Sequence, residues 1–204
     1  MQKSVSLEPN KYYHIYTRGN NKETLFRHPD NYHFFLQLYK KYAASFVDTF
    51  AYCLLPNHVH FLVQVKQEEA LKLQAVPENS AKLISVQRQL AHLLNAYANT
   101  INNRYDRAGR LFQHRFGRKE VTSEAYFTRL IYYIHFNPQH HGLISDFKAW
   151  PYSSYHSILS KSKTALQREE VLTWFGGREA YQQQHKEHAN DFKTISPFLE
   201  QDEL

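Results

Sequence analysis

Two histidines separated by one residue stand inside an apolar run, LLPNHVHFLV, at residues 54–63. Side chains of a β-strand alternate between its two faces, so His58 and His60 would share one face and Val59 and Phe61 the other. We expect the face with Val59 and Phe61 to be the core face, and little packing on the histidine face. Two adjacent imidazoles can bind one metal ion or one phosphate, but the same spacing also occurs without a function.

A second candidate group lies on a predicted helix, residues 123–136, which Ser123 would cap and Pro138 would stop. Helical spacing places Tyr133 and Asn137, four residues apart, on one stripe. A tyrosine hydroxyl has a pKa of about 10 and is a poor nucleophile at neutral pH. It can attack a phosphodiester when a divalent cation polarises the phosphate.

These two groups together contain the ligands of a weak site for Mg²⁺ or Mn²⁺: the imidazoles of His58 and His60 and the amide oxygen of Asn137. Simpler interpretations stay open, because a tyrosine on an amphipathic helix is often a core residue and an asparagine before proline can simply end a helix. Tyr132 also stays open as the nucleophile, although it faces about 100° away from Tyr133.

The composition favours a polyanionic partner. The 204 residues include 25 Lys and Arg against 19 Asp and Glu, which gives a net charge of +6, together with 15 Tyr, 14 Phe and 13 His. Aromatic rings stack on unpaired bases and basic groups bind phosphates, so this mixture fits single-stranded nucleic acid. An aromatic-rich core under a basic surface would give the same totals.

Several classes of protein are disfavoured by what the sequence lacks. Cys53 is the only cysteine, which excludes an internal disulfide and a cysteine-based zinc site. No apolar run approaches the ~18 residues of a membrane span, and the N-terminal residues do not resemble a secretory signal. We therefore expect a cytoplasmic protein with no membrane partner.

A basic segment between residues 101 and 120 is the first candidate for DNA contacts. Aromatic residues are interleaved with its cations, which are Arg104, Arg107, Arg110, Arg115, Arg118 and Lys119. Such side chains would bind the DNA backbone and so position the nucleic acid. Arg18, in the turn TRGNN, is a further candidate.

The hydrophobic periodicity predicts an α+β fold. Strands are expected at 11–17, 46–55, 58–65 and 112–121, and helices at 30–44, 81–102 and 123–136. Two strand–helix–strand units of this kind pack into one antiparallel sheet with helices on one face. The polar stretch 66–80 is predicted to be a loop, and the last 50 residues to form short helices that wrap the domain.

Five motifs in order resemble the HUH single-tyrosine transposases, and most closely the REP-associated tyrosine transposases. They are YHIYTRGNNKETLF, PNHVHFLV, YANTINNRYDRAGRLFQHRF, YYIHFNPQHHGL and WPYSSY. The resemblance covers about residues 11–156. It implies a ferredoxin-like HUH sandwich formed by residues 1–156, with residues 157–204 as a C-terminal helical extension packed on it.

The resemblance also implies roles for individual residues. His58 and His60 would be metal ligands, Asn137 the third ligand and Tyr133 the nucleophile. The implied enzyme is a metal-dependent endonuclease and strand transferase that acts on single-stranded DNA bearing a REP-like hairpin. It would form a 5′-phosphotyrosine and a free 3′-OH. The family usually has Asn-Pro-Val-Arg-Ala-Gly-Leu where this chain has NPQHHGL, so a DNA contact by that arginine is not expected here.

Two other functions remain open from the sequence. One is a protein that binds nucleic-acid hairpins on the same fold without cleaving them. The other is a histidine-dependent nucleotide hydrolase with a His-x-His-x-His motif, which would be incomplete because position 62 is Leu. The longer C-terminal region favours a monomer, and a dimer stays possible.

Overall fold

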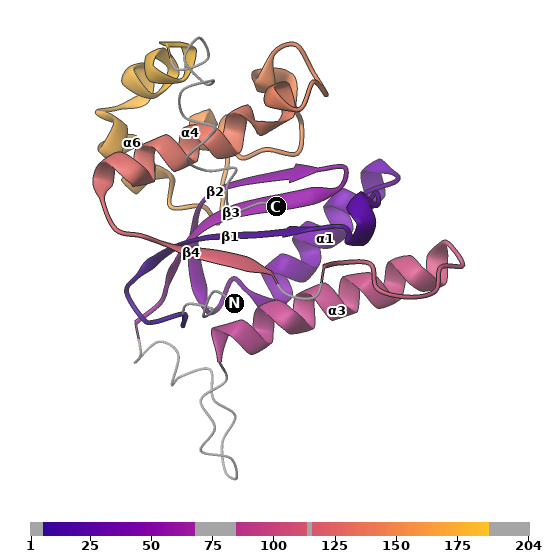
Figure 1. Cartoon of the computed structure of the whole chain (residues 1–204). Helices are drawn as coiled ribbons and strands as arrows, with labels where there is room; N and C mark the ends of the chain where they lie inside the picture. The colour runs from indigo at the N-terminus through magenta and orange to yellow at the C-terminus, as the bar shows by residue number, and fades with distance from the viewer. Residues whose placement is uncertain (1–5, 68–84, 114–115, 188–204) are drawn as a thin grey trace.

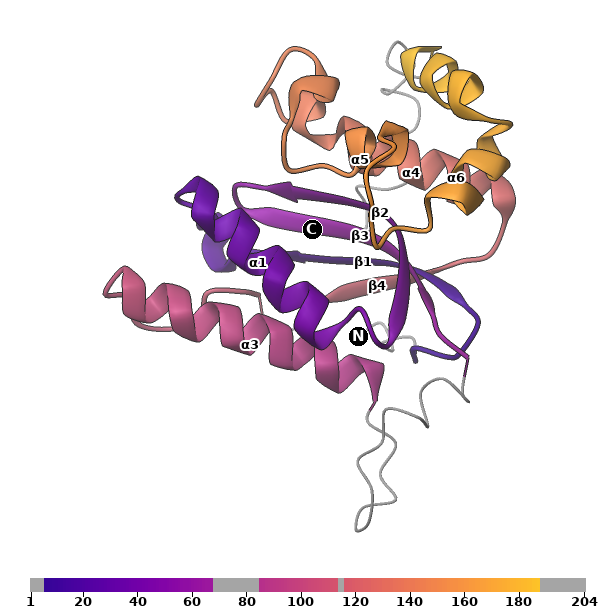
Figure 2. The same ribbon diagram turned by 180° about the vertical axis from the view of Figure 1, so that it is seen from behind.

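A four-stranded antiparallel sheet forms the centre of the protein, with helices on both sides of it (Figures 1 and 2). The computed structural model describes residues 6–67, 85–113 and 116–187. The strand order is β2-β3-β1-β4, which is that of a ferredoxin-like βαββαβ unit. The strands are β1 (Tyr12–Arg18), β2 (Val47–Leu55), β3 (His58–Val65) and β4 (Gly117–Val121). The predicted α+β class is confirmed.

The hairpin of β2 and β3 turns through Pro56 and Asn57, as the sequence predicts. Two backbone contacts attach this turn to the segment after β1: the Pro56 carbonyl accepts from the amide of Leu25 at 2.7 Å, and the Asn57 carbonyl accepts from the amide of Gly19 at 2.8 Å. The start of β3, where His58 lies, is therefore attached to the segment after β1 at two points. The 3₁₀ turn η1 (Asn20–Lys22) lies in that segment.

One face of the sheet is covered by the two crossover helices, α1 (Pro29–Tyr42) and α3 (Val86–Arg104), as Figure 2 shows. Val59 and Phe61 point into this core, where the ring of Phe61 stacks on that of Tyr39 with centroids 4.4 Å apart. The predicted helix 30–44 is thus observed. The predicted helix 81–102 begins within residues 68–84, which lie outside the described residues together with most of the predicted loop 66–80.

The other face is also covered, which corrects the expectation that helices lie on one face alone. Helix α4 (Glu124–His140) crosses that face over β2 and β3. Its apolar side chains Phe127 and Ile131 form a second core with Phe50 and Leu62. The sequence does not show this arrangement because α4 follows the βαββαβ unit, and no crossover geometry fixes the face on which it packs.

Helix α4 begins where predicted and ends later than predicted. Its N-cap is Ser123, whose hydroxyl accepts from the amide of Tyr126 at 3.2 Å. Pro138 was expected to stop the helix but lies inside its last turn, where a missing N–H removes only one hydrogen bond. The helix continues because the amide of His141 donates to the Asn137 carbonyl at 3.0 Å. Asn137 therefore lies within the helix.

The C-terminal region adds short helices to the α4 side of the sheet (Figure 1). They are η2 (Phe147–Ala149), α5 (Tyr155–Leu159), α6 (Arg168–Phe175) and the helical residues 178–187. Val171, Phe175 and Tyr181 join the core that α4 forms. The division at residue 156 stays a prediction.

Two other differences from the sequence-based prediction are smaller. The strand expected at 112–121 is observed only as β4, and Phe112 instead pairs with Gly19 in an isolated bridge. None of the described helices is long and apolar enough to cross a membrane.

Candidate functional site

The two histidines of β3 lie side by side under helix α4. Their ring centroids are 5.1 Å apart, and the exposed fractions are 4% for His58 and 1% for His60. The predicted alternation is confirmed, since Val59 and Phe61 point to the opposite core. The expectation of little packing on the histidine face is wrong, because α4 covers that face.

Helix α4 places Tyr133 and Asn137 over these histidines. The ring of Tyr133 meets the ring of His60 edge-on, with centroids 5.7 Å apart. One turn later the amide oxygen Oδ1 of Asn137 lies 3.2 Å from Nε2 of His58. The four residues that the sequence singles out for chemistry are thus brought together from two elements 79 residues apart.

His58 lies between two amide oxygens. Its Nδ1 is 2.7 Å from Oδ1 of Asn57, and its Nε2 faces Oδ1 of Asn137. The Asn137 oxygen keeps this orientation because the Nδ2 group of the same amide donates to the Tyr133 carbonyl at 3.5 Å. Both oxygens can only accept, and a neutral imidazole has a single N–H.

The protonation state of His58 follows from its surroundings. Burial, followed by the nearby His141, lowers the pKa of His58 to about 3, so the ring is neutral at pH 7. Placing its one proton on Nδ1, in the shorter contact with Asn57, leaves Nε2 without a proton. Nε2 then carries a lone pair that points at the lone pairs of the Asn137 oxygen. A cation placed between these two atoms would replace this unfavourable contact by two favourable ones.

His60 is held in a comparable way by an unpredicted neighbour. Nδ1 of His60 lies 3.0 Å from Nε2 of His14, a residue of the adjacent strand β1, and the two rings are stacked 5.2 Å apart. Burial lowers the pKa of His60 well below 6.5, and burial and Lys119 lower the pKa of His14 to about 3. Both rings are therefore neutral, which is the form that binds metals.

The residues present fit a divalent cation. Adjacent ligands of an octahedral Mg²⁺ are about 3.0 Å apart, and Nε2 of His58 and Oδ1 of Asn137 are separated by 3.2 Å. Asn57 and His14 bind the second ring nitrogens, as outer-shell partners of metal-binding histidines do. In the described part of the chain no three His, Cys, Asp or Glu side chains form a metal-binding group, so an amide such as Asn137 must complete this one.

The neighbouring tyrosine, Tyr132, points elsewhere. Its ring packs on Phe136 and His185, with centroids 5.6 and 5.5 Å away, in the core formed with the C-terminal helices. Only Tyr133 of the two contacts the rings of His14 and His60. This placement favours Tyr133 as the nucleophile.

A cavity of about 450 Å³ opens beside His58. Its lining includes Arg18, the last residue of β1, Lys22 from the turn after it, and His141 from the end of α4. The ring of His141 lies 4.8 Å from that of His58. Cations around this opening would attract a phosphate. Tyr133 itself is fully buried, so a phosphate reaches its hydroxyl only if α4 or its surroundings shift.

The structure divides the predicted basic segment into residues with different surroundings. Arg107 has a side chain only 10% exposed, which pairs with Glu23 and Asn102, and this placement argues against a DNA contact. Arg104 is half-exposed beside Asp30. On β4 the sheet alternation sends Arg118 to the α3 side and Lys119 to the α4 side. Arg110 is exposed, and Arg115 lies outside the described residues.

Three residues of the site were not assigned roles from the sequence: His14, Asn57 and His141. A signal for His14 exists, because it lies on the same face as Tyr12 and Tyr16 in the pattern Tyr-x-His-x-Tyr. The strand order β3-β1, which the pattern does not reveal, is needed to place His14 beside His60. Leu62, the third position of a His-x-His-x-His motif, is fully buried in the core.

Comparison with known proteins supports the resemblance seen in the motifs. No family model matches the chain. A curated protein of Haemophilus influenzae (strain ATCC 51907 / DSM 11121 / KW20 / Rd), assigned by name to the REP-associated tyrosine transposases, is 28% identical over 113 residues. The chain is similar to REP-associated tyrosine transposases. The match spans 53% of this chain and 59% of the length of that relative.

A solved structure agrees with this similarity at the level of the fold. It is described as a REP-associated tyrosine transposase bound to a REP hairpin, and it superposes with a TM-score of 0.56. The match covers 79% of this chain and 86% of that one, at 15% identity. The REP-associated transposases and this protein therefore share a fold, and the roles of individual residues must be argued from this chain.

Proposed function

We propose that this protein binds DNA hairpins and cuts and rejoins adjacent single-stranded DNA through Tyr133, in the manner of a transposase. The observation that carries this proposal is the contact between α4 and β3. It sets Tyr133 edge-on against His60 and turns the Asn137 oxygen toward the lone pair of His58. The similarity to REP-associated tyrosine transposases supports the same class of substrate.

In this proposal the three ligands have defined tasks. His58, His60 and Asn137 hold one Mg²⁺ or Mn²⁺, which when bound polarises the scissile phosphate. Asn57 and His14 keep the ligand rings oriented. The two cores on either side of the sheet keep this arrangement rigid, because β3 contributes to both.

Tyr133 carries the covalent step. A bond forms between its hydroxyl oxygen and phosphorus while the bond from phosphorus to the 3′ oxygen breaks. The tyrosine proton goes to solvent, and the leaving oxygen takes a proton to become a 3′-OH. The 5′-phosphotyrosine keeps a phosphodiester bond, so attack by another 3′-OH can reverse the step on a new strand.

Positive side chains around the site would guide the DNA. Arg18 and Lys22 line the cavity beside His58, and Lys119 lies on the same side of the sheet as His14. Glu120, the carboxylate of β4, pairs with Lys11. Phosphates are therefore attracted to this end of the sheet.

The complete burial of Tyr133 favours a second candidate function, a hairpin-binding protein that does not cleave. Such a protein would use the same basic surface and keep α4 closed over β3. The two candidates differ in one observable, which is a covalent link between the protein and DNA.

A capture experiment separates them. The protein is incubated with hairpin DNA bearing a single-stranded flank, in Mg²⁺ or Mn²⁺, and adducts that resist denaturant are resolved by gel. We expect the wild type to form an adduct that disappears with EDTA, and Tyr133→Phe to form none while binding the hairpin normally. The change removes one oxygen and keeps the packing of the ring.

Tyr132→Phe is the matched control, since it removes the same atom one residue away. It should form the adduct at the wild-type level. Hairpin binding without any adduct in the wild type would support the non-cleaving function. An adduct that survives in Tyr133→Phe would show that another residue is the nucleophile.

A further inference from the structure

The imidazole of His141 lies beside a proposed metal ligand at the C-terminal end of α4. Its ring meets that of His58 edge-on, with centroids 4.8 Å apart, and the two residues line the same cavity. The amide of His141 donates to the Asn137 carbonyl at 3.0 Å, which fixes the backbone of His141 one turn after Asn137. Residues four apart share a helix face, and both of these residues face His58.

His141 differs from the three proposed ligands in its exposure. His58, His60 and Asn137 are almost fully buried, whereas His141 is exposed. In the described part of the chain no three histidines form a ligand group, so the ring of His141 must turn to reach the cation. Exposed side chains change rotamer within nanoseconds, and this turn leaves both cores unchanged.

The sequence around His141 departs from the pattern of the REP-associated tyrosine transposases. Where that family usually has Asn-Pro-Val-Arg-Ala-Gly-Leu, this chain has NPQHHGL, so His141 occupies the place of an alanine. An alanine side chain has no donor atom. The third imidazole is therefore a property of this chain and is not implied by the similarity.

The donors around this cavity suit some cations better than others. The described lining contains the imidazoles of His58 and His141 and no carboxylate. Mg²⁺ sites in proteins depend on carboxylate or phosphate oxygens, whereas neutral imidazoles favour late transition metals such as Co²⁺ and Zn²⁺. A further imidazole should therefore strengthen the binding of those ions more than that of Mg²⁺.

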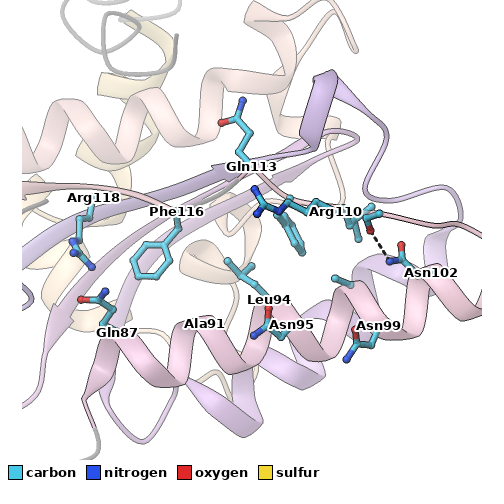
Figure 3. Close-up of a pocket in the computed structure, with 14 residues that line it drawn as sticks. Gln87, Ala91, Leu94, Asn95, Asn99, Asn102, Arg110, Gln113, Phe116 and Arg118 are labelled. Carbon is cyan, nitrogen blue, oxygen red and sulfur yellow. Dashed lines mark hydrogen bonds between the residues drawn. The ribbon is translucent and has the colours of Figure 1, made fainter. Parts of the chain in front are cut away.

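A polar groove of about 610 Å³ along α3 offers no comparable donors (Figure 3). Gln87, Asn95 and Arg110 are among the residues that line it, and its described lining contains no imidazole or carboxylate. Arg110 and Arg118 would repel a cation there. A transition metal is thus favoured beside His58 and not in this groove.

We propose that His141 is a fourth ligand of the proposed cation site and makes this site selective for late transition metals. Three imidazole nitrogens and one amide oxygen form a donor set that suits Zn²⁺ or Co²⁺. These ions can expand to a fifth ligand, which leaves a place for a phosphate oxygen. The inference rests on the proposed function, whose metal site it extends by one ligand.

The test measures metal binding on the EDTA-treated and dialysed full chain. Co²⁺ is titrated into the wild type and three variants, and its visible absorption reports affinity and coordination. The variants are His141→Ala, His58→Gln and His140→Ala. His140→Ala is the matched control, because it removes an exposed imidazole from the next residue, which does not line the cavity. Both alanine changes are at exposed positions, so these variants should fold.

We expect the wild type to show the strong visible bands of four- or five-coordinate Co²⁺. His141→Ala should bind Co²⁺ at least about tenfold more weakly and show the weaker bands of a six-coordinate ion, because water replaces the imidazole. Mg²⁺ should displace Co²⁺ from His141→Ala at a correspondingly lower concentration than from the wild type. His140→Ala should behave as the wild type does.

The outcomes separate this inference from the proposed function. Equal Co²⁺ affinity and spectra in His141→Ala and the wild type, with weaker binding in His58→Gln, would overturn the inference and leave the proposed metal site standing. Equal losses in His140→Ala and His141→Ala would also overturn it, since the ion would then bind to a surface pair. Equal binding by His58→Gln and the wild type would overturn the metal site of the proposed function, and this inference with it.

Discussion

His58 shows how the properties of single residues define the site. Its two ring nitrogens face two oxygens that can only accept, and burial keeps the ring neutral, so one of these contacts lacks a proton. A cation would satisfy that contact. The site should therefore be more stable with a metal ion bound than without one.

Metal removal gives a direct prediction. Saturating Mn²⁺ added to EDTA-treated wild type should raise the free energy of unfolding, by about 2.7 kcal/mol at a concentration one hundred times the Kd. His58→Gln should lose most of this gain, because it removes a ligand. Thermal unfolding with and without Mn²⁺ measures both.

The exposed His33 of α1 provides the control, and His33→Gln should keep the full stabilisation. An equal Mn²⁺ effect in His58→Gln and the wild type would place the metal elsewhere.

At the scale of elements, β4 supports the site through a glycine. A Cβ atom on Gly117 would lie 2.2 Å from the ring of Tyr16, so the ring can cross β4 only because no side chain is present there. Tyr16 in turn lies 4.8 Å from the ring of His14, which holds His60. The glycine therefore helps to fix His60, the proposed metal ligand, through two intermediate rings.

Gly117→Ala should destabilise the protein by about 1–3 kcal/mol, as overpacking does. The double variant Tyr16→Ala/Gly117→Ala tests the cause, because the ring that clashes is then absent. The cost of the glycine change should nearly vanish in the Tyr16→Ala background. Urea unfolding of the four proteins measures this coupling, and an unchanged cost in both backgrounds would rule out the proposed clash.

The periodicity of strands and helices also determines which parts of the site can be predicted from the sequence. Strand alternation correctly places His58 and His60 opposite Val59 and Phe61, and helix periodicity correctly aligns Tyr133 with Asn137. These are local properties with fixed periods. The contact between the two pairs, the continuation of α4 through Pro138 and the partnership of His14 with His60 depend on tertiary packing, which local patterns do not contain.

On the scale of the whole molecule, a chain of hydrogen bonds joins the sheet, α4 and the C-terminal helices. Nε2 of His135 accepts from the Ser154 hydroxyl at 2.7 Å, and Nδ1 of His135 donates to Nε2 of His185 at 3.0 Å. Nδ1 of His185 donates to the Tyr181 carbonyl at 2.7 Å, and the Ser154 oxygen accepts from the amide of Tyr52. Each ring N–H then has an acceptor when both imidazoles are neutral, and the Tyr181 hydroxyl also lies 3.3 Å from Nδ1 of His135.

This chain predicts that stability depends on pH. Burial, followed by His185, lowers the pKa of His135 well below 6.5, so below pH 6.5 the unfolded chain binds a proton that the folded chain does not. Stability should fall as pH falls through 6.5, with His135 contributing about 1 kcal/mol per pH unit. His135→Gln should have a shallower pH dependence.

Urea unfolding in EDTA between pH 5 and pH 8 compares the two proteins, and the difference in slope isolates His135 from the other buried histidines. Equal slopes would show that protonation of His135 is not linked to folding.

The most direct test of the account is to find which atom of the protein becomes attached to DNA. The adduct formed with hairpin DNA in Mg²⁺ or Mn²⁺ is digested with nuclease and trypsin, and peptide fragmentation locates the residue that carries the remaining 5′-phosphonucleotide. Trypsin cuts after Arg129, so Tyr132 and Tyr133 occur in one peptide and fragment ions must separate them. We expect the modification on Tyr133. A modification on Tyr132 or any other residue would contradict it.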